Sequence, residues 1–222
     1  MNQAAGKQEL KSERARRTIC EATIACLAER GYAETSINRV VETAGVSKGA
    51  LQHHYPSKEE LMASTASYLL ERPLRLADLS ADGTSKSSVR KRLLAIWDNL
   101  TNTEAYLALL EILIAARTDK ILHARIAADL KASISEIDDH FLPHYRDLSA
   151  AQRNDLLLLM TANRCLMRGL LIEENYGLSK ARQRAVLERW LDLVVPAFEH
   201  IDPVSADTPT GSAPHRPGED QT

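Results

Sequence analysis

Apolar residues recur at helical spacing along most of the chain, and no segment shows the alternation that marks a half-buried strand. One segment is especially clear: its apolar residues lie at i, i+3, i+4 and i+7, and they are Ile37, Val40, Val41 and Ala44. Thr35 or Ser36 stands before them, where an N-cap belongs. Gly45 comes directly after them, and glycine readily takes the left-handed backbone that ends a helix. This pattern predicts a short helix that ends at Gly45.

A second short helix is predicted immediately after this turn. Ser47 can cap it, and residues 48–53 form its body. Two short helices joined by a glycine-containing turn of about three to four residues form a helix-turn-helix motif. In that motif the second helix lies in the major groove of DNA, and its N-terminal residues meet the base edges. The sequence therefore predicts a helix-turn-helix at about residues 36–55.

The flanking segments add a helix on each side. Upstream, a helix ends at Gly31, and its apolar face consists of Ile19, Ala22, Thr23, Cys26 and Leu27. Downstream, Ser57 provides an N-cap and Glu60 occupies the third position of a capping box, so a new helix begins there. Pro73 ends or kinks this connecting helix. The three helices up to residue 56 are therefore expected to form a DNA-binding domain.

The rest of the chain also reads as helical, with helices expected at residues 89–101, 104–117, 120–141, 152–176 and 180–198. The second of these is apolar nearly all round, which is typical of a helix at the centre of its domain. Turn-rich polar sequence predicts a loop at residues 80–88. The fold is therefore expected to be all-α, with a flexible arm at 1–10, a helix-turn-helix domain at 11–56, a larger C-terminal helical domain at 57–200 and a disordered tail at 201–222.

Composition and charge narrow the function. The chain has 28 Lys and Arg against 30 Asp and Glu, so any basic surface for nucleic acid must be local. A local basic cluster precedes the helix-turn-helix: it contains Lys11, Arg14, Arg16 and Arg17, opposed by Glu13. The three cysteines lack metal-ligand spacing, so we interpret them as small buried hydrophobes and expect no metal and no cofactor. Because we find neither a signal peptide nor a membrane-spanning run, we expect a cytoplasmic protein with no membrane partner.

Residues 44–51 and 54–61 resemble the DNA-binding signature of TetR/AcrR-type transcriptional regulators. Two positions depart from it: Gln52 stands where the family usually has tyrosine, and Tyr55 replaces the usual phenylalanine. The resemblance implies a homodimer that binds a palindromic operator in double-stranded DNA, usually as a repressor. It further implies that an unknown small-molecule effector binds the C-terminal domain and releases the operator.

The DNA-binding surface is expected on the helix-turn-helix and its neighbours: Arg17, Thr35, Ser36, Asn38, Arg39, Ser47, Lys48, Gly49, Ala50, Gln52, His53, His54 and Lys58. Gln52 can bond an adenine edge with two hydrogen bonds, or it can contact phosphate. Adjacent histidines on a helix diverge, so His53 and His54 read as contacts to the DNA backbone. Lys58 matches the family lysine that reaches phosphate.

Polar residues interrupt the apolar C-terminal helices, and a buried charge must be paired or bound. Two readings stay open: salt bridges within or between subunits, or polar anchors in an apolar ligand pocket. On the second reading, the pocket is lined by Trp97, Tyr106, Glu111, Arg117, Met160, Asn163, Arg164 and Met167. By resemblance, the last two long helices form a four-helix dimer interface, with apolar contacts from Leu156, Leu159, Leu166, Leu170, Trp190 and Val194.

Two other classes of function have less support. An enzyme would need a convergent catalytic constellation, and the acidic and histidine residues at 136–144 spread around a helix instead. The remaining alternative is a helical protein-interaction module whose helix-turn-helix does not bind DNA. The sequence favours a ligand-responsive DNA-binding regulator that is not an enzyme.

Overall fold

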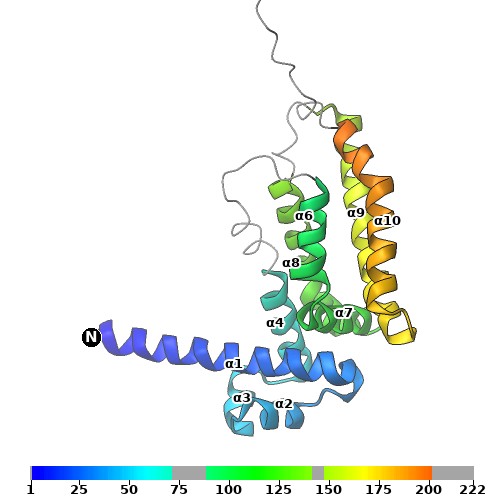
Figure 1. Cartoon of the computed structure of the whole chain (residues 1–222). Coiled ribbons are helices and arrows are strands. Elements are labelled where there is room, and N and C mark those ends of the chain that lie inside the picture. Colours follow the sequence, from blue (N-terminus) through cyan, green and yellow to red (C-terminus); the bar gives the residue numbers. More distant parts are fainter. Residues whose placement is uncertain (1, 72–88, 142–147, 202–222) are drawn as a thin grey trace, which may run out of the picture.

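The structure is a computed structural model that describes residues 2–71, 89–141 and 148–201 (Figure 1). Throughout these ranges the chain is helical and contains no strand, which confirms the all-α expectation. The expected loop at 80–88, the tail from residue 202 onward and Pro73 lie outside the described residues.

The helices follow the sequence pattern closely. In chain order they are α1 (Asn2–Glu34), α2 (Ile37–Ala44), α3 (Lys48–His54), α4 (Lys58–Leu70), α6 (Val89–Ile96), the π-helix η1 (Trp97–Thr101), α7 (Glu104–Ala116), α8 (Lys120–Phe141), α9 (Ala150–Glu173), the 3₁₀-helix η3 (Glu174–Tyr176) and α10 (Lys180–Ile201). The segment expected as one helix at 89–101 is α6 continued by a π-turn. Its last bond runs from the Asn102 N–H to the Trp97 carbonyl at 2.8 Å.

The first helix is longer than the sequence pattern predicts. Residues 1–10 were expected as a flexible arm, yet α1 is helical from Asn2 and projects from the body of the molecule (Figure 1). The physical reason is composition: Ala, Gln, Lys, Glu and Leu dominate this segment, and all are good helix formers. The predicted break at Gly31 is present, with φ 73° and ψ 175°, a backbone conformation that is almost confined to glycine.

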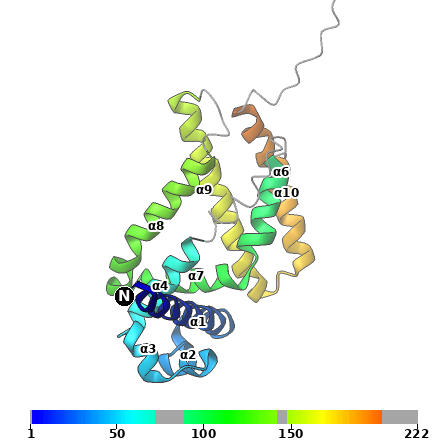
Figure 2. The same cartoon turned by 90° about the vertical axis from the view of Figure 1, so that its left-hand side faces the viewer.

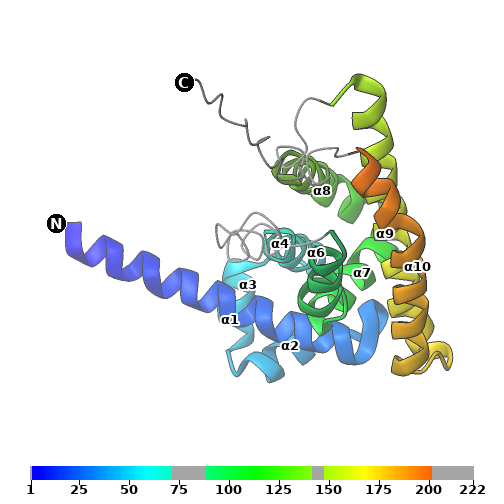
Figure 3. The same ribbon diagram turned by 45° about the horizontal axis from the view of Figure 1, so that its top comes forward.

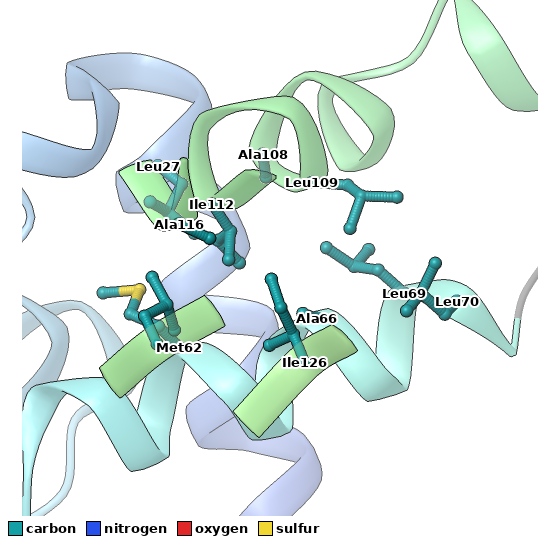
Figure 4. Close-up of a cluster of buried hydrophobic side chains, with 11 residues drawn as sticks. Leu27, Met62, Ala66, Leu69, Leu70, Ala108, Leu109, Ile112, Ala116 and Ile126 are labelled. Atoms are coloured by element: carbon teal, nitrogen blue, oxygen red, sulfur yellow. The ribbon is translucent and has the colours of Figure 1, made fainter. Parts of the chain in front are cut away.

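Three apolar clusters hold the chain together. The first joins α1, α2 and α3 with the start of α4, and its buried members are Ile19, Cys20, Ala22, Cys26, Val40, Leu51, Tyr55 and Leu61. The second joins α4, α7 and α8, and it includes Leu27 of α1, so the N-terminal domain packs directly on the C-terminal one (Figure 4). The third joins α6, η1, α9 and α10 around Trp97.

The C-terminal domain places its helices in two groups. α9 and α10 lie side by side along one edge of the molecule, away from α1–α3 (Figures 1 and 3). α7 lies across the end of this pair and against α1, α4 and α8. The helix-turn-helix and the α9–α10 pair therefore form two separate surfaces, and α7 lies between them.

Candidate nucleic-acid interface and C-terminal hollow

The turn between α2 and α3 is built by side-chain caps. Ser36 Oγ accepts a hydrogen bond from the Arg39 N–H at 3.4 Å, and Ser47 Oγ accepts one from the Ala50 N–H at 3.1 Å. Gly45 takes the left-handed conformation with φ 64°, and its N–H donates to the Glu42 carbonyl at 3.3 Å. These bonds satisfy backbone groups that the ends of short helices leave unpaired.

The third helix is anchored on one side and exposed on the other. Leu51 is fully buried in the N-terminal core, and Tyr55 lies in the same cluster. The exposed side carries five of the predicted residues: Lys48, Gly49, Ala50, Gln52 and His53. A short helix that presents small and polar side chains around one lysine can approach the floor of a DNA groove closely.

Tyr55 fixes the end of α3 more firmly than a phenylalanine would. Its Oη lies 3.3 Å from Ser64 Oγ, which donates to it, and 3.6 Å from the Cys20 sulfur. Burial raises the pKa of the Tyr55 phenol to about 12. The tyrosine at this position therefore adds polar contacts between α3, α4 and α1.

His54 is half-buried beside this anchor. Burial lowers the pKa of its imidazole, and the neighbouring His53 and the positive Arg16 lower it further. His54 is therefore mainly neutral at pH 7, and the permanent positive charge on this side of the molecule comes from lysine and arginine. α1 and α3 share the N-terminal apolar cluster, and Arg16 is near enough to His54 to lower the pKa of its imidazole, so the basic cluster of α1 lies on the same side of the molecule as α3.

Two residues predicted to contact DNA have other partners. Thr35 is fully buried, and its hydroxyl donates to the Gly31 carbonyl at 2.8 Å, so it bonds back to the break near the end of α1. Lys58 Nζ donates to the Tyr32 carbonyl at 2.9 Å and lies 4.3 Å from the centre of the Tyr32 ring. Burial lowers the pKa of this ammonium group. The buried Thr35 therefore does not reach DNA, which corrects that expectation. The Lys58 ammonium uses one of its three donors on this carbonyl, so its contact with phosphate stays a prediction.

The remaining predicted contacts are on the surface. Asn38 is exposed, and Ser36 and Ser47 are exposed caps. Arg39 forms an ion pair with Glu34 at 2.9 Å, and Arg17 forms one with Glu21 at 2.9 Å. Exposed pairs of this kind contribute little to stability, so both guanidinium groups can exchange their partner for another anion.

Most of the predicted pocket residues pack elsewhere. Trp97 and Met167 are buried in the third cluster, and Met160 is half-buried against it. Asn163 is buried, and its Oδ1 accepts a hydrogen bond from Trp190 Nε1 at 3.0 Å. These four residues are joined in a packed core, so the cavity expected around them is not where the structure has its hollow.

The remaining residues predicted to line the pocket do not converge on one site either. Glu111 Oε2 accepts a hydrogen bond from the Tyr32 N–H at 2.9 Å, so it joins α7 to the end of α1. Arg164 donates to Thr161 Oγ1 at 3.3 Å on the surface of α9. Tyr106 Oη accepts from Arg168 Nε at 2.8 Å. Arg117 is the predicted lining residue that does reach the hollow.

A hollow of about 470 Å³ lies between α7, α8 and α9. These helices are arranged like the sides of a triangle (Figure 2). The residues that line it are Leu113, Ala116, Arg117, His123, Ile126, Ala127, Leu130, Lys131, Ile134 and Arg168. Six of them belong to α8. The four-residue spacing of Ile126, Leu130 and Ile134 in the sequence indicates that α8 has an apolar face there. The sequence does not reveal that this apolar stripe faces a space.

One ion pair and two hydrogen bonds join α8 to α4 at three positions along the helices. Arg125 Nη2 lies 3.2 Å from Glu60 Oε1, and the Ser133 hydroxyl donates to the Leu70 carbonyl at 3.1 Å. Between them, the Ser67 hydroxyl donates to the Asp129 carboxylate. The carboxylate of Glu60, expected in a capping box, is thus used between helices. The wall of the hollow is bonded to the helix that comes after the helix-turn-helix.

The residues predicted to form the dimer interface pack in the core of the protomer instead. Leu156, Leu170 and Val194 are buried in the third cluster, and Leu159, Leu166 and Trp190 pack against it. The exposed apolar residues of α9, η3 and α10 are different ones: Leu158, Ile172, Tyr176 and Leu193. Cys165 is also exposed, in contrast to the buried cysteine expected.

The described residues contain neither a metal-binding cluster nor a membrane-spanning helix. No group of three or more His, Cys, Asp or Glu side chains among them is close enough to hold a metal ion. None of the described helices is long and apolar enough to cross a membrane.

The chain resembles known regulators over as much as 84% of its length. Residues 19–65 match the family model described as "Bacterial regulatory proteins, tetR family". HTH-type transcriptional regulator CymR of Pseudomonas putida is 28% identical over 197 residues, which span 84% of this chain and 94% of CymR. An uncharacterised HTH-type transcriptional regulator of Mycobacterium tuberculosis is 31% identical over 137 residues, 60% of this chain and 68% of that protein.

A solved structure agrees with these relatives. A TetR-family regulator described as putative, from Rhodococcus sp., superposes with a TM-score of 0.60 at 26% identity, and the match covers 82% of this chain and 99% of that one. The match extends from the helix-turn-helix into the C-terminal helices. The chain therefore belongs to the TetR family of transcriptional regulators.

Proposed function

We propose that the protein is a dimeric repressor that binds a palindromic operator and releases it when a small molecule enters the C-terminal domain. The observation that carries this proposal is the exposed face of α3, which presents Lys48, Gly49, Ala50 and Gln52 on the side of the molecule where α1 carries its basic cluster. Close approach to the bases needs small side chains, and phosphate contact needs fixed positive charge.

The exposed surface of α9 supports self-association. Positions 151, 155, 158, 162, 165, 169, 172 and 176 are exposed and alternate at spacings of four and three residues. Apart from one aspartate, they carry small or apolar side chains, of which Leu158 is 60% exposed and Tyr176 80% exposed. Apolar residues at this spacing form the seam between packed helices. With α10 alongside, two copies would bring four helices together.

A two-fold dimer accounts for a palindromic operator. Each α3 would enter one major groove, and half-sites one turn apart require the two recognition helices to stand about 34–36 Å apart. Because α9 and α10 lie away from α1–α3, pairing through them leaves both helix-turn-helix motifs free to face the same DNA.

The hollow supports regulation by a small molecule. An effector that binds there prefers one arrangement of α7 and α8, and α8 is bonded to α4 through Glu60, Ser67 and Leu70. A ligand shifts an equilibrium only by its difference in affinity for the two states. Release of the operator therefore requires that the effector bind the state with the wrong spacing of recognition helices more tightly.

The test is footprinting of the purified protein on DNA that flanks its own gene. Protection of two symmetric half-sites is expected, and Lys48→Ala should weaken binding and reduce the salt slope by about one unit. Lys180→Ala is the matched control, since this exposed lysine starts α10, far from α3. Equal binding by the parent and Lys48→Ala proteins at every salt concentration would remove α3 from the proposal. No DNA binding at all would favour a protein-interaction module.

A further inference from the structure

The charged residues that line the hollow are all basic. Its floor is apolar, with six residues from α7 and α8: Leu113, Ala116, Ile126, Ala127, Leu130 and Ile134. Three cations, Arg117, Lys131 and Arg168, stand around this floor together with His123, and no carboxylate is among the lining residues. The whole chain has slightly more acidic than basic residues, so three cations without an acid are a local departure.

The three cations come from three different helices. Arg117 is the residue directly after α7, Lys131 lies in α8, and Arg168 lies in α9. Neither Arg117 nor Lys131 has an ion-pair partner among the described residues. A ligand that met all three would connect α7, α8 and α9 across the hollow.

Arg168 is held in place by an aromatic residue. Its Nε donates to Tyr106 Oη at 2.8 Å, and its guanidinium lies 5.9 Å from the centre of the same ring. One of the donors of the guanidinium is thus used, and its two terminal nitrogens retain theirs. A guanidinium fixed in this way loses less freedom on binding, and its planar fork suits a carboxylate.

We infer that the hollow binds an amphipathic organic monoanion, an apolar body that ends in a carboxylate. The body would lie on the leucine, isoleucine and alanine floor, and the carboxylate would face Arg117, Lys131 and Arg168. A volume of about 470 Å³ lies in the lower half of the range for ligand pockets, so the ligand is small. Three like charges disfavour a cationic ligand, and the apolar floor gives no partner to a polyanion. This inference rests on the proposed function and names the class of its effector.

Two pairs of probes of equal shape test it: octanoate with octanamide, and 3-phenylpropanoate with 3-phenylpropanamide. Isothermal titration of the full chain should show that at least one carboxylate binds about 10- to 100-fold more tightly than its amide, as expected for charge-assisted hydrogen bonds. Lys131→Gln should reduce that preference about tenfold, because it removes one of the three positive charges. Lys131 has no hydrogen bond or ion pair within the described residues, so the substitution breaks no other contact there.

Arg164→Gln is the matched control, since Arg164 is on α9 beside the hollow but bonds Thr161 on the surface. It should bind both probes as the parent protein does. Three results would overturn the inference: equal affinity for carboxylate and amide, no binding of either carboxylate at millimolar concentration, or equal losses in Lys131→Gln and Arg164→Gln.

The DNA assay on the same preparation separates the two proposals. A protein that binds its operator but neither carboxylate refutes the inference and leaves the operator-binding function intact. A protein that binds a carboxylate through Lys131 but no DNA refutes the proposed function alone.

Discussion

The contact between Glu111 and Tyr32 gives a sharp prediction about how the two domains are joined. Glu111 lies in α7, is half-buried, and accepts the Tyr32 N–H at 2.9 Å just after the Gly31 break. In Glu111→Ala this backbone N–H loses its acceptor. We expect the variant to open the end of α1 locally while the helices themselves persist.

The magnitude is set by the chemistry of the bond. A hydrogen bond to a charged group contributes about 1.5–3 kcal/mol net, and an N–H left without a partner costs about 1–3 kcal/mol. Glu111→Ala should therefore reduce the free energy of opening at Tyr32 by about 2 kcal/mol. Glu111→Gln keeps an oxygen acceptor without the charge, and its loss should be roughly half as large.

Amide hydrogen exchange of a peptide that spans residues 28–36 measures this opening directly. Exchange at Tyr32 should be about 10- to 100-fold faster in Glu111→Ala and intermediate in Glu111→Gln, given that about 1.4 kcal/mol corresponds to tenfold. Glu29→Ala is the control, since Glu29 is exposed and its ion pair is with its neighbour Arg30 rather than with α7. Unchanged exchange in Glu111→Ala would show that this bond does not hold the domains together.

Other contacts give four further predictions. Gly31→Ala should destabilise the protein by about 1–3 kcal/mol in chemical denaturation, because its backbone suits glycine and the added carbon would stand 3.0 Å from the Glu111 carboxylate. Tyr55→Phe should show a flatter loss of stability between pH 10 and 12. The parent's unfolded phenol ionises above about pH 10 and its folded phenol only near 12, so up to about 3 kcal/mol of stability is present below pH 10 and lost as pH rises; equal slopes would contradict this. Gln52→Ala should cost about 1–3 kcal/mol at one base pair of the operator if it reads adenine, whereas a uniform loss over an operator panel would assign it to phosphate. Leu158→Glu should convert the proposed dimer to a folded monomer in analytical ultracentrifugation, and a dimer of unchanged dissociation constant would exclude this face.

The local features of the fold could be predicted from the sequence. Ser36 and Ser47 cap the helices that they precede, and α8 has the expected bounds, residues 120–141. These features depend on neighbouring residues alone, such as a cap, an apolar spacing or a glycine. The error at residues 1–10 has a similar origin, because helix formers were present there without an apolar face.

The contacts between helices could not be predicted in this way. α9 has apolar residues on two sides, so Leu156 faces the core while Leu158 faces solvent, and only the positions of α6 and α10 decide which is which. Lys58 reads as an exposed cation until the fold places the Tyr32 carbonyl within its reach. The hollow depends on three helices at once, so single-helix patterns identified only Arg117 at its wall.

Three side-chain contacts join α8 to α4, and the length of α4 sets how far a tilt at one of its ends moves the other. α4 has 13 residues and is therefore about 20 Å long, so a tilt of about 5° shifts its far end by about 1.7 Å. In a two-fold dimer the shifts of both copies add to about 3.5 Å, close to the spacing of one base-pair step. If these contacts pass a rearrangement at the hollow on to α4, a tilt of this size would put the two recognition helices of the proposed dimer out of register with the DNA by about one base pair.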